Sequence, residues 1–166
     1  MISTTPSEGL VALAAAGSDR LRVRVAALIL LDGRIVLVRH RAGSSTYHLL
    51  PGGGVAHGET LEDAVIREVR EETGLDVSLG KLLFVNDTID PATGRHLVNI
   101  TFGAQIMGGF ITDKPEDPRV EAVDMLSPES LAALDIRPPL AEAIQRHLAG
   151  DSIESRYLGS LFTEGR

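Results

Sequence analysis

Three glutamates, Glu68, Glu71 and Glu72, lie together in segment 60–73, which the spacing of its apolar residues predicts to be a helix. Gly74 follows, and a glycine at this position usually ends a helix in the left-handed conformation. At about 100° per residue, the glutamates share one face of this helix with apolar residues. These apolar residues are Leu61, Ala64, Val65 and Val69.

A glutamate cluster on a helix is usually a solvent-exposed face. Here the acids are expected on the face that must be buried, and Thr73 is expected on the opposite one. Glu68 and Glu72 are i,i+4 neighbours, where like charges cost about 0.2–0.5 kcal/mol even in solvent. Burial raises that cost. Because Arg67 and Arg70 are expected to point elsewhere, a divalent cation is the simplest neutralising partner.

The chemistry of the available ligands restricts the metal. Carboxylates offer oxygen, and the chain contains no cysteine, so a hard ion such as Mg²⁺ or Mn²⁺ is favoured over zinc. Mg²⁺ usually binds one or two protein carboxylates and leaves its other positions to water and substrate phosphates. A carboxylate-held ion that polarises phosphorus and activates water can cleave a phosphate anhydride. The residues therefore indicate a metal-dependent phosphohydrolase.

The elements that must position this helix can also be predicted. Two strand-like runs, one from Arg22 and one over 34–39, flank Asp32-Gly33 and predict a hairpin. A polar loop is expected over 41–47 and a glycine-rich turn over 51–54. Further strands are expected at 82–86, 97–105 and 122–126, a charged loop at 112–119, a helix start at 127–129 and a last helix at 140–148. Strands on both sides of a helix predict an α/β fold with a mixed sheet between helices.

The segment that starts at Gly53 resembles the Nudix box, G-x5-E-x7-R-E-U-x-E-E-x-G-U, where U is apolar. All nine positions match with the right gaps: Gly53, Glu59, Arg67, Glu68, Val69, Glu71, Glu72, Gly74 and Leu75. The resemblance implies a Nudix-type α/β/α sandwich with a mixed β-sheet. It also implies a Mg²⁺-dependent hydrolase that cleaves the diphosphate bond of a nucleoside diphosphate linked to another moiety, such as a nucleoside triphosphate, ADP-ribose or another nucleotide sugar.

The resemblance also implies roles for individual residues. Glu68 and Glu72 would be the main side-chain metal ligands, with Glu71 beside them as a ligand or water partner. The Gly52 carbonyl would complete the metal's shell. Among the structural residues, Glu59 would pair with Arg67 to hold the loop on the helix, and Gly53 and Gly74 would shape the two ends of the motif.

The general base varies within the family that the segment resembles. It is a box glutamate in some members, here Glu68 or Glu71, and a carboxylate from a later loop in others. Glu121 and Glu116 are the later candidates, and Glu121 is preferred because it adjoins a strand that returns towards the site.

Polar residues at strand ends are candidates for substrate binding. Arg39, His40 and Arg41 could bind substrate phosphates, although surface charge at a strand end explains them equally well. The same two interpretations, recognition of a base or sugar and an ordinary role in a turn or strand, apply to three residues further along the chain. These are Asn86, Asp87 and Asn99.

The composition of the chain restricts which kinds of binding partner are expected. A net charge of −7 disfavours a nucleic-acid strand, whereas a small nucleotide remains compatible. The apolar run 10–17 is too short for a membrane span and no Lys or Arg precedes it, so no membrane or signal segment is expected. The absence of cysteine agrees with a cytoplasmic location, and it argues against an isomerase that needs a catalytic cysteine.

The expected organisation is an extension over 1–20, one domain over 21–150 and a tail over 151–166. Apolar residues between Tyr157 and Phe162 predict that the tail packs on the domain or on the partner in a homodimer. The alternative function is a non-catalytic nucleotide-binding regulatory module. Such modules commonly lose box carboxylates, and none is missing here.

Overall fold

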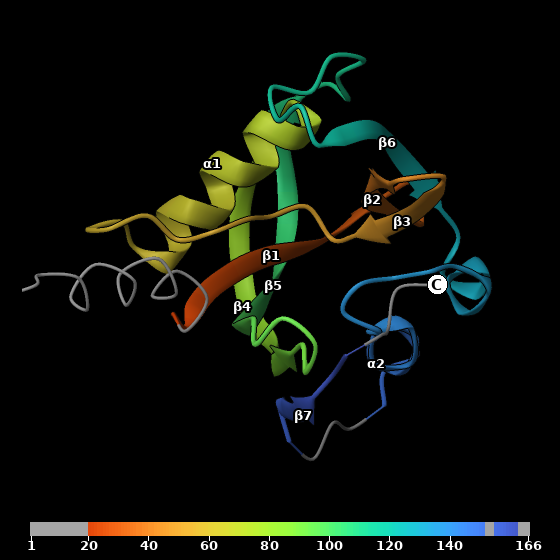
Figure 1. Cartoon of the computed structure of the whole chain (residues 1–166). Coiled ribbons are helices and arrows are strands. Elements are labelled where there is room, and N and C mark those ends of the chain that lie inside the picture. The colour runs from red at the N-terminus through yellow and green to blue at the C-terminus, as the bar shows by residue number, and fades with distance from the viewer. Residues whose placement is uncertain (1–19, 152–154, 163–166) are drawn as a thin grey trace, which may run out of the picture.

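The computed structural model describes residues 20–151 and 155–162, so nearly all of the expected N-terminal extension lies outside the described residues. A mixed seven-stranded sheet has the order β3-β2-β1-β5-β4-β7, with β6 paired to β2 (Figure 1). Its strands are β1 (Arg22–Leu31), β2 (Arg34–Ala42), β3 (Ser45–Leu49), β4 (Leu75–Ile89), β5 (His96–Gly109), β6 (Val120–Leu126) and β7 (Tyr157–Ser160). The helices are α1 (Leu61–Thr73), the short 3₁₀ helix η1 (Pro128–Ala133) and α2 (Ala141–Leu148).

Strand β1 separates two apolar layers. Its residues Val25, Ala27 and Ile29 face the cluster that contains Val65 and Val69 of α1. The alternate residues Ala26 and Leu28 face a second cluster, which contains Leu131, Ile136, Leu140 and Ile144 from η1, α2 and their connection. A strand in parallel pairing with β5 and buried on both faces is typical of a sheet between helical layers. The predicted α/β/α architecture is therefore confirmed.

The first predicted hairpin is confirmed, and the loop after it was predicted wrongly. Asp32 and Gly33 both have positive φ angles, 51° and 73°, as a two-residue hairpin turn requires. Segment 41–47 was expected to be a loop, but β2 continues to Ala42 and pairs with β3, with Ala42 opposite Ser45. Strand β3 is an edge strand whose first residues are exposed. Its sequence therefore lacks the alternation of a half-buried strand.

Helix α1 begins and ends where the sequence predicts. Thr60 caps it by accepting a hydrogen bond from the Asp63 N–H at 3.1 Å, and Gly74 ends it in the left-handed region at φ 77°. The expectation that Thr73 faces solvent is wrong, because this residue is fully buried. Its hydroxyl donates to the Val69 carbonyl at 2.6 Å. The Thr112 N–H, at the start of the returning 112–119 loop, donates to the Thr73 carbonyl at 2.9 Å.

The chain after α1 differs from its prediction mainly in length. Strands β4 and β5 extend beyond the expected 82–86 and 97–105. Their pairing contains register shifts, and such irregularities increase the local twist of paired strands. The predicted helix start at Ser127 begins a 3₁₀ helix. Strand β7, which was not predicted, pairs in parallel with β4. Among the described helices, none has the length and apolar content needed to cross a membrane.

Candidate active site

A glycine-rich segment lies flat against β1 and forms the base of the site. The Val25 N–H donates to the Gly53 carbonyl at 2.9 Å, and the Ala27 N–H donates to the Pro51 carbonyl at the same distance. A Cβ on Gly52, which has a φ of 149°, would overlap the Val25 carbonyl oxygen. This close approach of two backbones explains why position 52 requires glycine.

The same segment holds the glutamates of α1. The Gly52 N–H donates to Oε2 of Glu72 at 2.8 Å, and a Cβ on Gly53 would overlap the Glu68 carboxyl group. Glu68 is 8% exposed and Glu72 is 1% exposed. The predicted burial of these two acids is therefore confirmed, and the two glycines bring the backbone directly against both carboxylates. The same expectation is wrong for Glu71, whose side chain is 36% exposed because it lies at the edge of the buried face.

The expectation that Arg67 points away from the acids is wrong. Its Nη1 donates to Oε1 of Glu68 at 2.7 Å and lies 3.3 Å from Oε2 of Glu71. Its Nε donates to Oε1 of Glu59 at 2.8 Å, which is the pair that the resemblance implies. This hydrogen bond, with that from the Ala56 N–H, lowers the pKa of Glu59 to about 2. A helical wheel places only Cα positions, whereas the long arginine side chain reaches back across the helix.

A second arginine, Arg24 on β1, also lies near Glu68 and Glu72. Its role at the site was not predicted from the sequence. Its Nη2 donates to the Leu50 and Gly52 carbonyls, each at 2.9 Å. Burial raises the pKa of Glu72 to about 7, and the Gly52 N–H and the positive charge of Arg24 oppose that rise. A charged residue between Val23 and Val25 in a predicted strand was the available signal.

The donor set fits a hard cation that binds partly through its substrate. The buried carboxylates of Glu68 and Glu72 lie against Gly53 and Gly52, and the Gly52 carbonyl accepts a hydrogen bond from Arg24. In the described ranges 20–151 and 155–162, no three Asp, Glu or His side chains are close enough to hold an ion alone. Two carboxylates nevertheless suffice for Mg²⁺, because it keeps several positions for water and phosphate oxygens.

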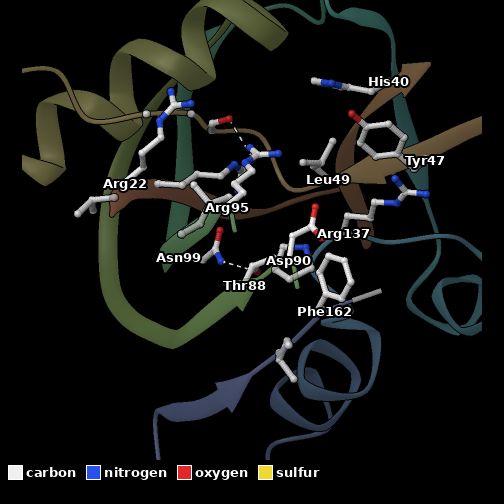
Figure 2. Close-up of a pocket in the computed structure, with 18 of the residues that line it drawn as sticks. Arg22, His40, Tyr47, Leu49, Thr88, Asp90, Arg95, Asn99, Arg137 and Phe162 are labelled. Carbon is white, nitrogen blue, oxygen red and sulfur yellow. Dashed lines mark hydrogen bonds between the residues drawn. The ribbon is translucent and has the colours of Figure 1, made fainter. Parts of the chain in front are cut away.

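Glu72 and the glycine segment line a pocket of about 500 Å³. We call the part formed by Gly52, Gly53, Gly54 and Glu72, with Glu68 packed against Gly53, the helix end. We call the part where Figure 2 shows Tyr47, Asp90, Arg137 and Phe162 the far end. Other lining residues include Arg22, Arg24, Arg95 and Arg119. The guanidinium groups give the pocket the charge that a diphosphate requires.

His40 lines this pocket, as a substrate-binding role would require. It is 8% exposed, and its Nε2 has no hydrogen-bond partner among the described residues. Burial lowers the pKa of His40, and the nearby charge of Asp117 opposes that shift. A neutral imidazole can donate or accept one hydrogen bond through such a nitrogen.

Arg39, Arg41 and Glu121 lie together outside the residues that line the pocket. Nε of Arg41 donates to Oε1 of Glu121 at 3.1 Å, and Nε of Arg39 lies 3.6 Å from Oε2 of the same carboxylate. Strand alternation separates both arginines from His40. The other base candidate, Glu116, is exposed, and its backbone N–H donates to the Glu71 carbonyl at 2.9 Å.

The 112–119 loop contributes two residues that were not singled out. Arg119 lines the pocket, and its Nε lies 3.0 Å from both carboxylate oxygens of Asp117. The charge of Asp117 adds to the rise that burial causes in the pKa of Glu72 and opposes the fall that burial causes in the pKa of His40, so this loop is close to the site. The only available signal was the alternation of acids and bases in a loop.

The three polar candidates on β4 and β5 have different roles. Asn99 is buried, lines the pocket and donates to the Thr88 hydroxyl at 2.9 Å. Asp87 instead binds Tyr157 and His96, and Asn86 is buried and donates to the Asp87 carbonyl at 3.1 Å. Of the three, only Asn99 is in a position to contact a ligand of the pocket.

Comparison with known proteins agrees with this geometry. The model of the NUDIX domain family matches residues 20–147. The chain is 33% identical over 111 residues to an ADP-ribose pyrophosphatase from Methanocaldococcus jannaschii; the match covers 66% of each protein, so this chain spans just under two thirds of that relative. Among solved structures, a NUDIX hydrolase from Nitrosomonas europaea has a TM-score of 0.70 and 27% identity, covering 83% of this chain and 93% of that one. A MutT NUDIX hydrolase from Burkholderia pseudomallei has a TM-score of 0.58 and 38% identity, covering 66% and 85%.

Proposed function

The chain belongs to the NUDIX domain family, and from that premise we propose that it is a Mg²⁺-dependent pyrophosphohydrolase. Its substrate is a small nucleoside diphosphate linked to another moiety, such as a nucleoside triphosphate, ADP-ribose or another nucleotide sugar. Mn²⁺ can replace Mg²⁺ in an oxygen-ligand site of this kind. The family match confirms the resemblance drawn from the glutamate-bearing segment.

One observation carries the proposal. Two buried carboxylates, those of Glu68 and Glu72, lie against the backbone of Gly53 and Gly52, and Glu72 and both glycines line an arginine-rich pocket. Arg67 and Arg24 offset part of the charge of these acids, yet burial still raises the pKa of Glu72 to about 7. Keeping this carboxylate ionised is therefore costly in a protein that does not use it. A diphosphate in the pocket would complete the shell of a cation at these acids and would bind the arginines with its remaining oxygens.

The residues divide the work of the reaction. Glu68, Glu72 and the Gly52 carbonyl would hold the ion, which would polarise the phosphorus and lower the pKa of its bound water. Arg24 and Arg119 would orient the phosphate oxygens with charge-assisted hydrogen bonds, and His40 would supply one further hydrogen bond. Glu59 and Arg67 would keep the glycine segment on the helix.

The base that orients or deprotonates water is proposed to be a box glutamate, Glu68 or Glu71. Glu71 is partly exposed beside the buried pair, where water can reach it. Glu121 is the weaker candidate, because Arg39 and Arg41 already bind its carboxylate and it does not line the pocket in the described residues. In this arrangement Arg39 and Arg41 form ion pairs with Glu121 and do not bind the substrate.

Turnover of a nucleotide panel tests the proposed function. The panel holds ADP-ribose, the deoxynucleoside triphosphates and diadenosine polyphosphates, each assayed with Mg²⁺ and with EDTA, and the products are separated by anion-exchange chromatography. We expect Mg²⁺-dependent cleavage of at least one member to two phosphate-bearing products, and loss of that cleavage in a folded Glu72→Gln variant.

Two outcomes would contradict the proposal. Cleavage that persists at full rate in Glu72→Gln would remove the metal assignment. Tight nucleotide binding without turnover of any panel member would favour the regulatory module instead. Since every box carboxylate is present and two are buried against the glycine segment, we expect neither.

A further inference from the structure

The C-terminal tail reaches the far end of the pocket and is held there by several contacts. The Val85 N–H donates to the Arg156 carbonyl at 2.8 Å, and the Leu161 N–H donates to the Asp87 carbonyl at 2.7 Å. Between these backbone contacts, β7 pairs in parallel with β4. The tail therefore forms a structured strand on the sheet, and its path next to β4 is fixed at both ends.

A polar cluster adds a side-chain anchor to this strand. The Tyr157 hydroxyl donates to Oδ2 of Asp87 at 2.6 Å, and Nε2 of His96 lies 2.8 Å from Oδ1 of the same carboxylate. These hydrogen bonds lower the pKa of Asp87. The anchor joins β4, β5 and β7, so it ties the tail to the two strands that carry Thr88 and Asn99 on the pocket lining.

The anchored strand places Leu161 and Phe162 in the pocket lining. Phe162 is 37% exposed, so one part of its ring packs and another remains open. Figure 2 shows it at the end of the pocket where Asp90 and Arg137 also lie. The guanidinium carbon of Arg137 lies 4.4 Å from the centre of the Tyr47 ring, so this end contains two aromatic rings and a flat cation.

We propose that the tail determines the substrate preference of this pocket, with Phe162 stacking on the nucleobase while the diphosphate lies at the helix end. The inference rests on the proposed function and adds a residue outside the 20–147 span of the family match. A flat aromatic ring and a guanidinium are the groups on which nucleobases stack. The base and diphosphate of one nucleotide thereby occupy opposite ends of a single pocket.

Two ligands that cannot be cleaved at a diphosphate separate this inference from catalysis. AMP carries the base and ribose 5-phosphate lacks it, and binding of each is measured by isothermal titration calorimetry with Mg²⁺ present. We expect the unaltered protein to prefer AMP. Phe162→Ala should weaken AMP binding by at least about 5-fold, the lower range for loss of one stacked aromatic, and leave ribose 5-phosphate within about 2-fold. Phe162→Trp should retain the AMP affinity.

A matched variant controls for effects on folding. Phe110→Ala removes a ring that is 90% exposed and does not line the pocket. This variant should bind AMP normally. Equal loss of AMP and ribose 5-phosphate in Phe162→Ala, unchanged AMP binding in that variant, or no preference for AMP in the unaltered protein would each overturn the inference. Absence of turnover with AMP preference intact would instead reject only the proposed function.

Discussion

The helix end and the far end of the pocket are built in different ways. At the helix end, Gly52, Gly53, Glu68 and Glu72 come from one short stretch of sequence, and direct backbone contacts fix their arrangement. At the far end, Tyr47, Asp90, Arg137 and Phe162 come from four separate segments that meet only through the sheet and its connections. The helix end suits diphosphate cleavage, the step that all the proposed substrates share. The residues of the far end can differ between proteins without disturbing the helix end.

The largest effect should come from Glu68 at the helix end. Glu68→Gln removes a buried charge that the proposed cation needs. Loss of a group that only supports a metal ligand typically costs about 10–100-fold, so loss of a ligand itself should lower turnover at least about 100-fold. Glu71→Gln alters a partly exposed carboxylate and should cost less where Glu68 both binds the cation and serves as the base. Steady-state kinetics on the best panel substrate measures both, and circular dichroism checks the fold. Equal losses in the two variants would instead assign the base to Glu71, because loss of a general base costs about 100-fold or more.

Gly53→Ala should have the next largest effect. Its Cβ would overlap the Glu68 carboxyl group, so the carboxylate or the loop must move. We expect turnover to fall by about 10–100-fold, the range found when a ligand loses its orientation. Gly54→Ala is the matched control, because the nearest atom to its new Cβ is Nη2 of Arg22 at 3.9 Å. If both alanine variants retained full activity, the close approach at Gly53 would have no catalytic role.

The helix end could largely be predicted because its causes are local. The helical period placed Glu68 and Glu72 on the buried face, and Thr60 and Gly74 marked the ends of the helix. Arg67 was misplaced because a wheel does not describe how far a long side chain reaches. Local patterns therefore fix the backbone of this region but not its ion pairs.

The far end could not be predicted, for the opposite reason. Tyr47 lies in an edge strand that has too little burial to show alternation, and Phe162 follows a strand of four residues whose pairing with β4 is long-range. Arg137 contacts Tyr47 only because the chain after η1 returns to β3, through the His48 N–H and the Asp135 carbonyl. Contacts between segments so far apart in the sequence leave no periodic pattern of apolar and polar residues from which they could be predicted.

The stability of the protein should depend on pH through the helix end. Of the two ends, it is the helix end that contains a carboxyl group with a strongly raised pKa, that of Glu72. Burial moves the pKa of Glu72 from its ordinary 4.5 to about 7, so the metal-free folded protein binds the proton more tightly than the unfolded chain. This stabilisation is full below about pH 4.5 and is lost as the pH rises through about 7. Its size is on the order of 3 kcal/mol, from 1.36 kcal/mol for each pKa unit.

Denaturant unfolding in EDTA, repeated from pH 5 to pH 8, measures this change. The unaltered protein should lose stability over that range, and Glu72→Gln should lose less because its side chain does not titrate. Mg²⁺ binding requires the ionised carboxylate, so its stabilising effect should increase over the same range. A pH profile that is identical in the two proteins would show that Glu72 ionises normally.

The smallest expected effect is that of Tyr157→Phe at the far end. This change removes only the hydroxyl that binds Asp87, and one such hydrogen bond contributes about 0.5–1.5 kcal/mol. Because the backbone contacts of β7 remain, the tail should loosen without detaching. We therefore expect KM for a nucleotide substrate to rise about 2–5-fold while kcat stays unchanged, since the carboxylates of the helix end are not altered.

Asp87→Asn provides the complementary change, because it keeps the shape of the side chain but removes the charge that both Tyr157 and His96 contact. It should raise KM at least as much as Tyr157→Phe. Combining the two changes should add little, because both act on one anchor. Additive effects, or a fall in kcat with KM unchanged, would mean that the polar cluster acts on the helix end and that the two ends of the pocket are not independent.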